Sequence, residues 1–234
     1  MRVLITPFVL LLALLTVACT VHAQAASQQP LTYVAIGASD AVGVGAANPE
    51  TDGWVPRFGA ELGPNVRVVN LGVSGSTLGQ ALQEQLGPAV DAQPDVVTVW
   101  MAVNDLNAGV PLEQYAAQLD TLLGGLESTH ARVLVGNVPD LSALAAYHGL
   151  DAAQVTAEVN RWNVVIADTT ARHGDTLVDL YAHWQEIAEH PEYLSADGFH
   201  PSSDGYKALA EAFMSAYEAG DAEGESRGEA VSGA

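Results

Sequence analysis

Short apolar runs rich in β-branched residues alternate with longer segments of helical periodicity along most of this chain. The runs lie at residues 33–36, 66–71, 96–101, 133–135 and 176–180. Most are continuous rather than alternating in polarity, as in parallel strands that are covered on both faces. The helical segments lie at residues 54–62, 78–86, 112–126, 152–171 and 206–217, and Gly63, Gly87 and Gly174 stand at plausible helix ends. This order predicts a three-layer α/β/α sandwich with a mainly parallel sheet of about five strands, a flavodoxin-like arrangement.

The composition favours one globular domain and excludes a nucleic-acid partner. The chain has 234 residues, of which 49% are hydrophobic, enough for the core of one domain. Its 28 acidic residues outweigh its 8 Lys and Arg residues and give a net charge of -20. Such a surface repels phosphate backbones and lacks the basic stripe that nucleic-acid binding requires.

Residues 1–25 have the order of a bacterial export signal. Arg2 precedes an apolar run that ends in small residues, and that run is short for a transmembrane helix. Cleavage after Ala23 or Ala25 would release a soluble protein, whereas the segment that ends at Cys19 resembles a lipobox and would anchor the protein by lipidation. Thr16 stands where the lipobox usually has an aliphatic residue, so free secretion is favoured. We expect a periplasmic or extracellular protein, associated with the membrane only if it is lipidated at Cys19.

The remaining chain divides into a domain and a tail. Residues 26–218 contain all the predicted strands and helices. Residues 219–234 consist mainly of Gly, Ala, Ser and Glu, with almost no large apolar side chains. A segment of this composition cannot bury enough apolar surface to fold, so we predict a disordered acidic tail.

Polar segments follow three of the predicted strands and precede the last helix. They lie at residues 37–40, 70–77, 102–106 and 197–201. In open α/β sheets, ligands bind outside the carboxyl ends of the strands, so these segments are candidates for one shared site. Each segment also has a structural interpretation when taken alone, as a helix cap, a glycine-rich turn or a surface loop.

Four of these polar residues have side chains that suit acyl transfer. Gly37 permits a tight turn from strand to helix that would present the hydroxyl of Ser39 at the sheet edge. Asn104 carries a carboxamide that can donate a hydrogen bond to a developing oxyanion. Asp197 and His200 are three residues apart, so the carboxylate can hold one imidazole nitrogen while the other faces the serine.

Taken together, the blocks Gly-x-Ser, Gly, Asn-Asp and Asp-x-x-His-Pro resemble the signature of the SGNH or GDSL hydrolase family. The resemblance implies a serine esterase with Ser39 as the nucleophile, His200 as the base and Asp197 as the partner of His200. It also implies an oxyanion hole formed by the amides of Ser39 and Gly72 and by the side chain of Asn104. It implies neither a cofactor nor a metal.

The resemblance covers residues 33–213, with two departures in its motifs. The usual Gly-Asp-Ser-Leu has Ala38 and Asp40 here, and the usual Gly-x-Asn-Asp has Ala102 in place of its glycine. Neither departure removes a reacting atom, so we expect them to affect the pocket and the choice of substrate. Residues 141–150, which follow the fourth strand, are expected to border the acyl pocket.

The implied function is the hydrolysis of esters or thioesters through an acyl-enzyme. We expect small to medium acyl groups, because no connection between the predicted elements is long enough to form a separate lid domain. Two alternatives remain open at this point. The first is a non-catalytic surface or carbohydrate-binding protein with the same fold. The second is an acyltransferase, in which an alcohol acceptor competes with water.

Overall fold

Five parallel strands form the middle layer of the protein, in the order β2-β1-β3-β4-β5. The computed structural model describes residues 30–183 and 190–232. The strands are β1 (Thr32–Gly37), β2 (Arg67–Asn70), β3 (Val96–Trp100), β4 (Arg132–Gly136) and β5 (Thr176–Val178). This order and direction confirm the predicted flavodoxin-like sheet, whose chain reverses its direction of winding between β1 and β3.

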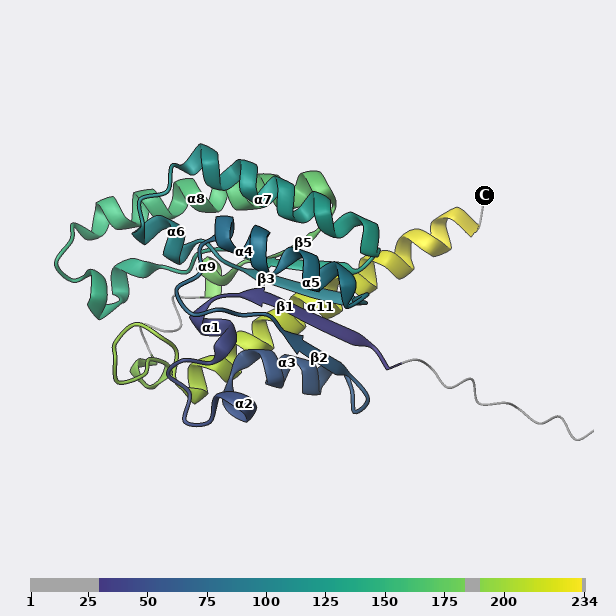
Figure 1. Ribbon diagram of the computed structural model, residues 1–234, viewed down its shortest axis with the longest axis horizontal. Helices are drawn as coiled ribbons and strands as arrows, with labels where there is room; N and C mark the ends of the chain where they lie inside the picture. Colours follow the sequence, from purple (N-terminus) through teal and green to yellow (C-terminus); the bar gives the residue numbers. More distant parts are fainter. Residues whose placement is uncertain (1–29, 184–189, 233–234) are drawn as a thin grey trace, which may run out of the picture.

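Helices cover both faces of the sheet (Figure 1). One face packs against α3 (Trp54–Leu62) and α11 (Ser203–Ser232), and the other against α4 (Leu78–Glu84), α5 (Leu86–Asp91), α7 (Leu112–Leu126) and α8 (Ala152–His173). The short helices are α1 (Ser39–Val42), α2 (Pro49–Asp52), α6 (Val103–Asn107) and α9 (Leu180–His183). Single 3-10 turns lie at Glu127–Thr129, Leu141–Ala143, Ala145–Tyr147 and Pro191–Tyr193. In Figure 1, α1, α6 and α9 lie at the same end of the sheet, where the strands finish.

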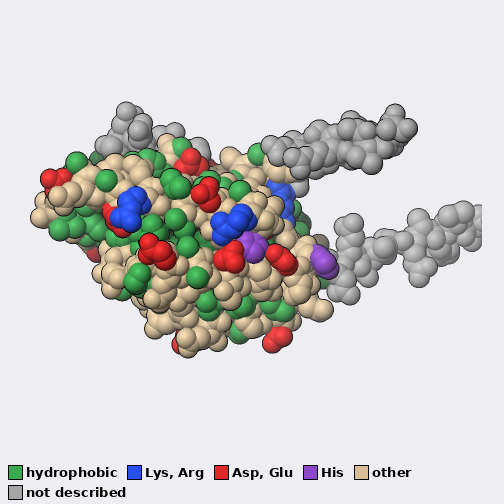
Figure 2. Space-filling model, turned by 90° about the horizontal axis from the view of Figure 1, so that it is seen from above, with side chains coloured by type: hydrophobic (Ala, Val, Ile, Leu, Met, Phe, Trp, Pro, Cys, Tyr) green, Lys and Arg blue, Asp and Glu red, His purple; other side chains and the backbone are tan. Residues whose placement is uncertain are grey.

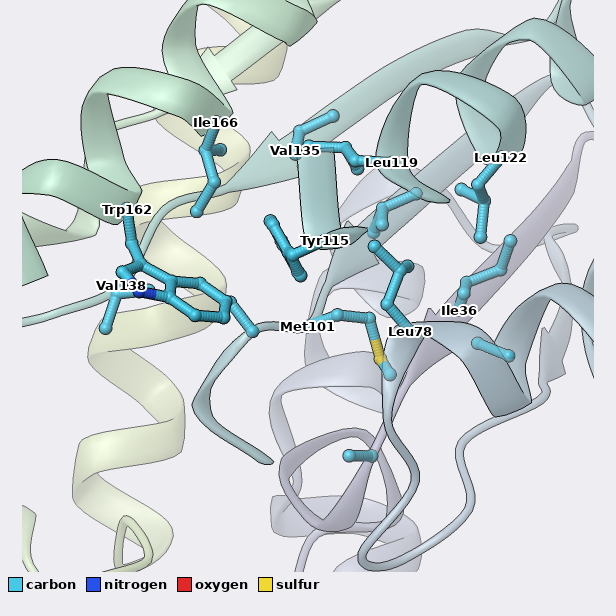
Figure 3. Close-up of a cluster of buried hydrophobic side chains, with 14 of the residues drawn as sticks. Ile36, Leu78, Met101, Tyr115, Leu119, Leu122, Val135, Val138, Trp162 and Ile166 are labelled. Carbon is cyan, nitrogen blue, oxygen red and sulfur yellow. The ribbon is translucent and has the colours of Figure 1, made fainter. Parts of the chain in front are cut away.

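The larger core lies between the sheet and the layer of α4, α5, α7 and α8. Ile36 points into it from β1, and Leu78, Tyr115 and Trp162 reach it from α4, α7 and α8 (Figure 3). All four side chains are buried. Burying an aliphatic or aromatic side chain of this size contributes about 1.5–3 kcal/mol, so this layer is a major source of stability.

An aromatic cluster joins the helices on the opposite face. Trp54 of α3 stacks on Phe213 of α11 with ring centroids 4.4 Å apart. Tyr33 of β1 meets Phe58 of α3 edge to face at 5.0 Å. Because α11 begins only three residues after His200, this packing also fixes the place of the segment that carries the imidazole.

Three features of the structure were not expected from the sequence. β2 is an edge strand and Val68 is 39% exposed, because only one neighbouring strand and part of one helix layer cover it. Gly87 lies inside α5 and does not end a helix, since α4 stops before it at Glu84. α11 continues to Ser232, through most of the predicted disordered tail (219–234). The abundant Ala and Glu residues of that segment favour helix, and they extend a helix that is already nucleated by its packed first half.

The export signal predicted for residues 1–25 lies outside the described residues. Within the part that the structure describes, no helix combines the length and the apolarity that a membrane span needs. Figure 2 shows Arg, Asp and Glu side chains close together over the face that α7 and α8 cover. Two ion pairs of these helices join Arg172 to Asp120 at 3.0 Å and Arg161 to Glu158 at 2.8 Å.

Candidate active site

Ser39 lies at the turn between β1 and α1. Gly37 makes this turn possible, because a Cβ atom there would lie 2.6 Å from the Cβ atom of Ala41. The buried side chain of Gln85 fixes the same residue: its amide donates to Gly37 O, and its carbonyl accepts from Gly37 N–H, both at 3.0 Å. Ser39 itself is 8% exposed. Gln85 was not predicted, although it lies three residues after Leu82 and seven after Leu78, so a polar residue on the apolar face of this helical segment was a signal for it.

A chain of hydrogen bonds joins Ser39, His200 and Asp197, as the sequence predicts. His200 Nε2 lies 3.0 Å from Ser39 Oγ, and His200 Nδ1 lies 2.7 Å from Asp197 Oδ2. Ser39 and His200 are 161 positions apart in the sequence, so the fold brings two distant segments together here. The fold therefore places a serine hydroxyl, an imidazole and a carboxylate in line.

The surroundings of Asp197 fix the protonation of the imidazole. Partial burial acts to raise the pKa of Asp197, but the His200 side chain, the N–H groups of Phe199 and His200, and the Ser195 hydroxyl all donate to its carboxylate and hold the pKa well below its usual range. An ionised carboxylate can only accept hydrogen bonds, so His200 Nδ1 carries a proton. In the neutral ring, Nε2 is then the acceptor for the Ser39 hydroxyl.

A short loop holds Asp197 and His200 in this arrangement. Its two ends are joined by an antiparallel bridge between Leu194 and Pro201, and Ser195 N–H donates to His200 O at 2.9 Å. Gly45, in the loop after α1, packs directly against this hairpin-like loop. A Cβ atom at Gly45 would lie 3.1 Å from His200 Cβ and would collide with Pro201 O. The loop after Ser39 and α1 thus also supports His200.

Asn104 faces the site from the first turn of α6, at the end of β3. Its Nδ2 donates to Ser76 O at 2.9 Å, and both residues line a hollow with Ser39. The amide has two N–H groups, so the second remains for a ligand in this hollow. The structure therefore brings Asn104 to Ser39, as predicted.

Gly72 has a different environment from the one that the sequence predicts. Its N–H donates to Asn70 Oδ1 at 3.0 Å, so this group is already engaged. The residue of this loop that lines the hollow at Ser39 is Ser76, and neither Gly72 nor Gly75 does so. A Cβ atom there would lie 2.7 Å from Ala41 Cβ, so the glycine serves close packing of this loop on α1. Gly75 lies further along the same loop, with φ +79, in a turn closed by Ser76 N–H and Val73 O. Its N–H has no hydrogen-bond partner among the described residues.

Asp105 is a structural carboxylate of this site. It is fully buried, and both of its oxygens accept from Leu78 N–H, at 3.1 and 3.0 Å. Burial raises the pKa of Asp105, and the bonds from Leu78 oppose this effect. The contact ties α6, which carries Asn104, to the first residue of α4. It also anchors the loop that contains Gly75.

Two adjoining hollows open beside Ser39. The first includes Ser39, Ser76 and Asn104 in its wall. The second includes Leu141 and Leu144, so part of the segment expected to border an acyl pocket does line a hollow. Among residues 30–183 and 190–232, no cluster of three or more His, Cys, Asp and Glu side chains is placed to hold a metal ion.

This arrangement suits acyl transfer. A serine hydroxyl that donates to a neutral imidazole can lose its proton as it attacks a carbonyl carbon, and nearby N–H groups can hold the oxyanion that forms.

Comparisons with known proteins agree with this geometry. Residues 35–208 match the GDSL-like lipase/acylhydrolase family. The chain is 27% identical over 172 residues to an acetylxylan esterase from Geobacillus stearothermophilus, and the match covers 66% of this chain and 72% of that protein. An alpha/beta hydrolase enzyme from the metagenome of Lake Arreo, Spain, is similar in structure, with a TM-score of 0.65 and 23% identity over 80% of this chain and 94% of the other. The lipase/acylhydrolase from Enterococcus faecalis is also similar in structure, with a TM-score of 0.62 and 24% identity, and the match covers 78% of this chain and 92% of that one.

The family match spans most of the chain, from β1 into α11, and contains Ser39, Asn104, Asp197 and His200. It confirms the resemblance seen in the sequence motifs, and the structural neighbours confirm the α/β/α fold. The chain therefore belongs to the GDSL-like lipase/acylhydrolase family and is an enzyme that hydrolyses esters.

Proposed function

We propose that this protein hydrolyses small to medium acyl esters or thioesters through an acyl-enzyme on Ser39. The observation that carries the proposal is the unbroken line of hydrogen bonds from Asp197 through His200 to Ser39. Ser39 Oγ attacks the carbonyl carbon while its proton passes to His200 Nε2. The ionised Asp197 stabilises the imidazolium that forms and keeps its own charge.

The acyl-enzyme then forms and breaks down by proton transfers through the same imidazole. His200 gives its proton to the leaving oxygen or sulfur as the bond to the acyl carbon breaks. Water next attacks the acyl carbon and gives a proton to His200, which returns it to Ser39 as the acid leaves.

The oxyanion is held by three N–H donors in this proposal: the amides of Ser39 and Gly75 and the side chain of Asn104. Ser39 is the first residue of α1, where backbone N–H groups have no partner within the helix. Gly75 replaces the predicted Gly72, because the N–H of Gly72 is already donated to Asn70.

Among ester substrates, we propose acetyl esters of hydroxylated alcohols. The support is the similarity to an acetylxylan esterase together with the open form of the two hollows. A series of p-nitrophenyl esters of increasing acyl length tests the acyl preference. The greatest turnover on the longest chain would contradict it.

The test of the mechanism is labelling with a fluorophosphonate, which reacts readily only with an activated serine. We expect labelling of the purified protein and its loss in Ser39→Ala. Ser128→Ala is the matched control, because this serine is exposed on the turn after α7. A protein that stays unlabelled while Ser39 is intact would contradict the proposed nucleophile. A rate of acyl transfer to added alcohol above that of hydrolysis would favour the acyltransferase alternative.

We also propose that the protein is exported and freely released. The support is the order of charged, apolar and small residues in positions 1–25, with Val21 and Ala23 at a small-residue cleavage site. Intact-mass measurement of the natively processed protein tests the proposal. A mass that retains Cys19 with added acyl chains, or loss of membrane association in Cys19→Ser, would show a lipoprotein instead.

A further inference from the structure

We propose that Asp40 accepts a hydrogen bond from a hydroxyl group in the alcohol part of the substrate, and so selects esters of hydroxylated alcohols. This inference rests on the proposed hydrolysis at Ser39 and adds a residue that determines specificity. Asp40 directly follows Ser39 in α1, where the motif of the family usually has leucine.

Asp40 lies between the two hollows. It contributes to the wall of both, together with Trp100, Val103 and Phe199. The second hollow is otherwise lined by apolar side chains, those of Leu141 and Leu144 among them. A single carboxyl group therefore interrupts an apolar surface next to the nucleophile.

Among the described residues, the Asp40 carboxyl group has no hydrogen-bond donor except its own backbone N–H. The titratable groups that influence it are His200, Asp197 and Tyr206. His200 is engaged with Asp197 and Ser39, and the Tyr206 hydroxyl donates to Val44 O at 2.6 Å. Burial raises the pKa of Asp40 to about 6, whereas the charge of His200 acts to lower it. A half-buried carboxyl group without a donor from another residue needs one from solvent or substrate.

The choice of the alcohol part follows from the residues that line the two hollows. The hollow at Ser39 receives the reacting carbonyl group, and the wall that it shares with the second hollow, which includes Asp40, is left for the alcohol. Trp100 and Phe199 offer apolar surface to the carbon skeleton of that alcohol, and Asp40 offers an acceptor to its hydroxyl groups. This combination fits a polyol or a sugar, whose C–H groups and hydroxyls lie on different sides of the molecule.

The experiment compares glycerol 1-acetate with n-propyl acetate, which have the same acyl group and the same number of alcohol carbons. We measure the ratio of the two kcat/KM values in the wild-type protein, Asp40→Asn and Asp40→Leu. A hydrogen bond to a charged group favours the hydroxylated ester on the order of 10-fold or more. We therefore expect Asp40→Leu to lower the ratio by about 10-fold, and Asp40→Asn, which keeps an acceptor oxygen, to lower it less.

Two controls make this result specific. Asp91→Asn removes one exposed carboxylate at the end of α5, just before β3 begins and thus at the opposite edge of the sheet, and should keep the wild-type ratio. Fluorophosphonate labelling of each variant counts the active sites, so a poorly folded fraction does not alter the ratio. If Asp40→Leu proves unstable, the ratio in Asp40→Asn decides.

A ratio within twofold of wild type in both Asp40 variants would overturn the inference. Acetylcholine, a cationic ester without a donor, distinguishes charge attraction from hydrogen bonding. An equal loss for acetylcholine and glycerol 1-acetate in Asp40→Leu would also overturn it. Failure of the proposed function looks different, because the wild-type protein would then hydrolyse neither acetate and would resist labelling.

Discussion

The contact between Gly45 and the loop of His200 can be tested by adding a single methyl group. Gly45 has φ +97, a conformation that L side chains rarely adopt. The added Cβ atom of Gly45→Ala would lie 3.0 Å from Ser195 Cβ and 3.1 Å from His200 Cβ, and it would collide with Pro201 O. The backbone oxygen cannot rotate away, so we expect the whole loop to shift relative to Ser39.

The magnitude has two parts, and a matched variant separates them. The left-handed conformation alone costs a residue with a Cβ atom about 1–2 kcal/mol. Gly174, at the end of α8, has φ +74, and a Cβ atom added there would meet nothing within 4 Å, so Gly174→Ala carries this cost without the collision. Displacement of a catalytic group by about 1 Å can cost on the order of 10²-fold in rate. We expect Gly45→Ala to lose about 10-fold to 100-fold in kcat and Gly174→Ala to lose none.

The assay combines p-nitrophenyl acetate hydrolysis, fluorophosphonate titration of active sites and thermal unfolding. Gly174→Ala should lower the melting temperature by about 2–8 °C, which corresponds to 1–2 kcal/mol in a domain of this size. Gly45→Ala should lower it by at least as much and should also lower kcat per titrated site. If the kcat of Gly45→Ala stays within twofold of wild type while its stability falls as in Gly174→Ala, then the loop does not depend on this packing and the reasoning is refuted.

Four further predictions concern the oxyanion donor, the turn at the nucleophile, pH and metals. Asn104→Ala should lower kcat by roughly 10²–10³-fold, the usual cost of one oxyanion donor, and an unchanged kcat would remove Asn104 from the mechanism. In Gln85→Leu, Gly37 O keeps the bond from Val73 N–H but Gly37 N–H loses its side-chain partner, so urea unfolding should show a loss of about 1–3 kcal/mol, and an unchanged stability would contradict this role. Because burial raises the pKa of Asp40 from 3.8 to about 6, the folded state binds its proton more tightly than the unfolded state does. The contribution of Asp40 to the free energy of unfolding should therefore fall by up to about 3 kcal/mol as pH rises from about 4 to 6, and Asp40→Asn should show a flatter profile than the wild-type protein over that range. A chelator should leave the rate of ester hydrolysis unchanged, and a rate that is abolished by chelation and restored by a divalent ion would contradict the serine mechanism.

The larger elements were predictable because their signals are local. The bounds of α3 and α7 equal the predicted segments, since apolar residues at spacings of three and four mark the face that the sheet buries. The strand positions followed equally well from continuous apolar runs. The edge position of β2 was not predicted, because strand order is a property of the whole sheet and no pattern within one run states which strand lies at its edge.

The proposed reacting groups of the site could be predicted from the sequence, whereas the residues that support them were harder to predict. Ser39, Asp197 and His200 stand in recognisable motifs, and the fold brings them within hydrogen-bond distance. Gly72 and Gly75 lie in the same glycine-rich segment, and only the backbone shows which N–H is already donated. The sequence could not show this difference, because it depends on the direction of a peptide group rather than on residue type.

Ala102 shows where this chain has departed from its family and at what cost. It stands in place of the usual glycine with φ +104, a strained conformation for a residue with a side chain. The surrounding structure imposes that strain: Ala102 is 1% exposed, and its carbonyl accepts from Leu106 N–H at 2.8 Å. Asp105, within the same helix, is bound on both oxygens to Leu78.

These contacts keep Asn104 in place, although a positive φ is unfavourable for an alanine such as Ala102. Ala102 lines the hollow at Ser39, and so does Asp40, which is the other departure from the family motifs. Ala102 adds a methyl group where the family usually has glycine, Asp40 replaces an apolar side chain by a carboxyl group, and the hydrogen-bonded line from Asp197 to Ser39 stays intact. Backbone strain persists at a site when the surrounding packing holds it. We therefore expect the two departures to affect which esters the chain accepts, and we expect substitutions of Asp40 and Ala102 to alter that choice.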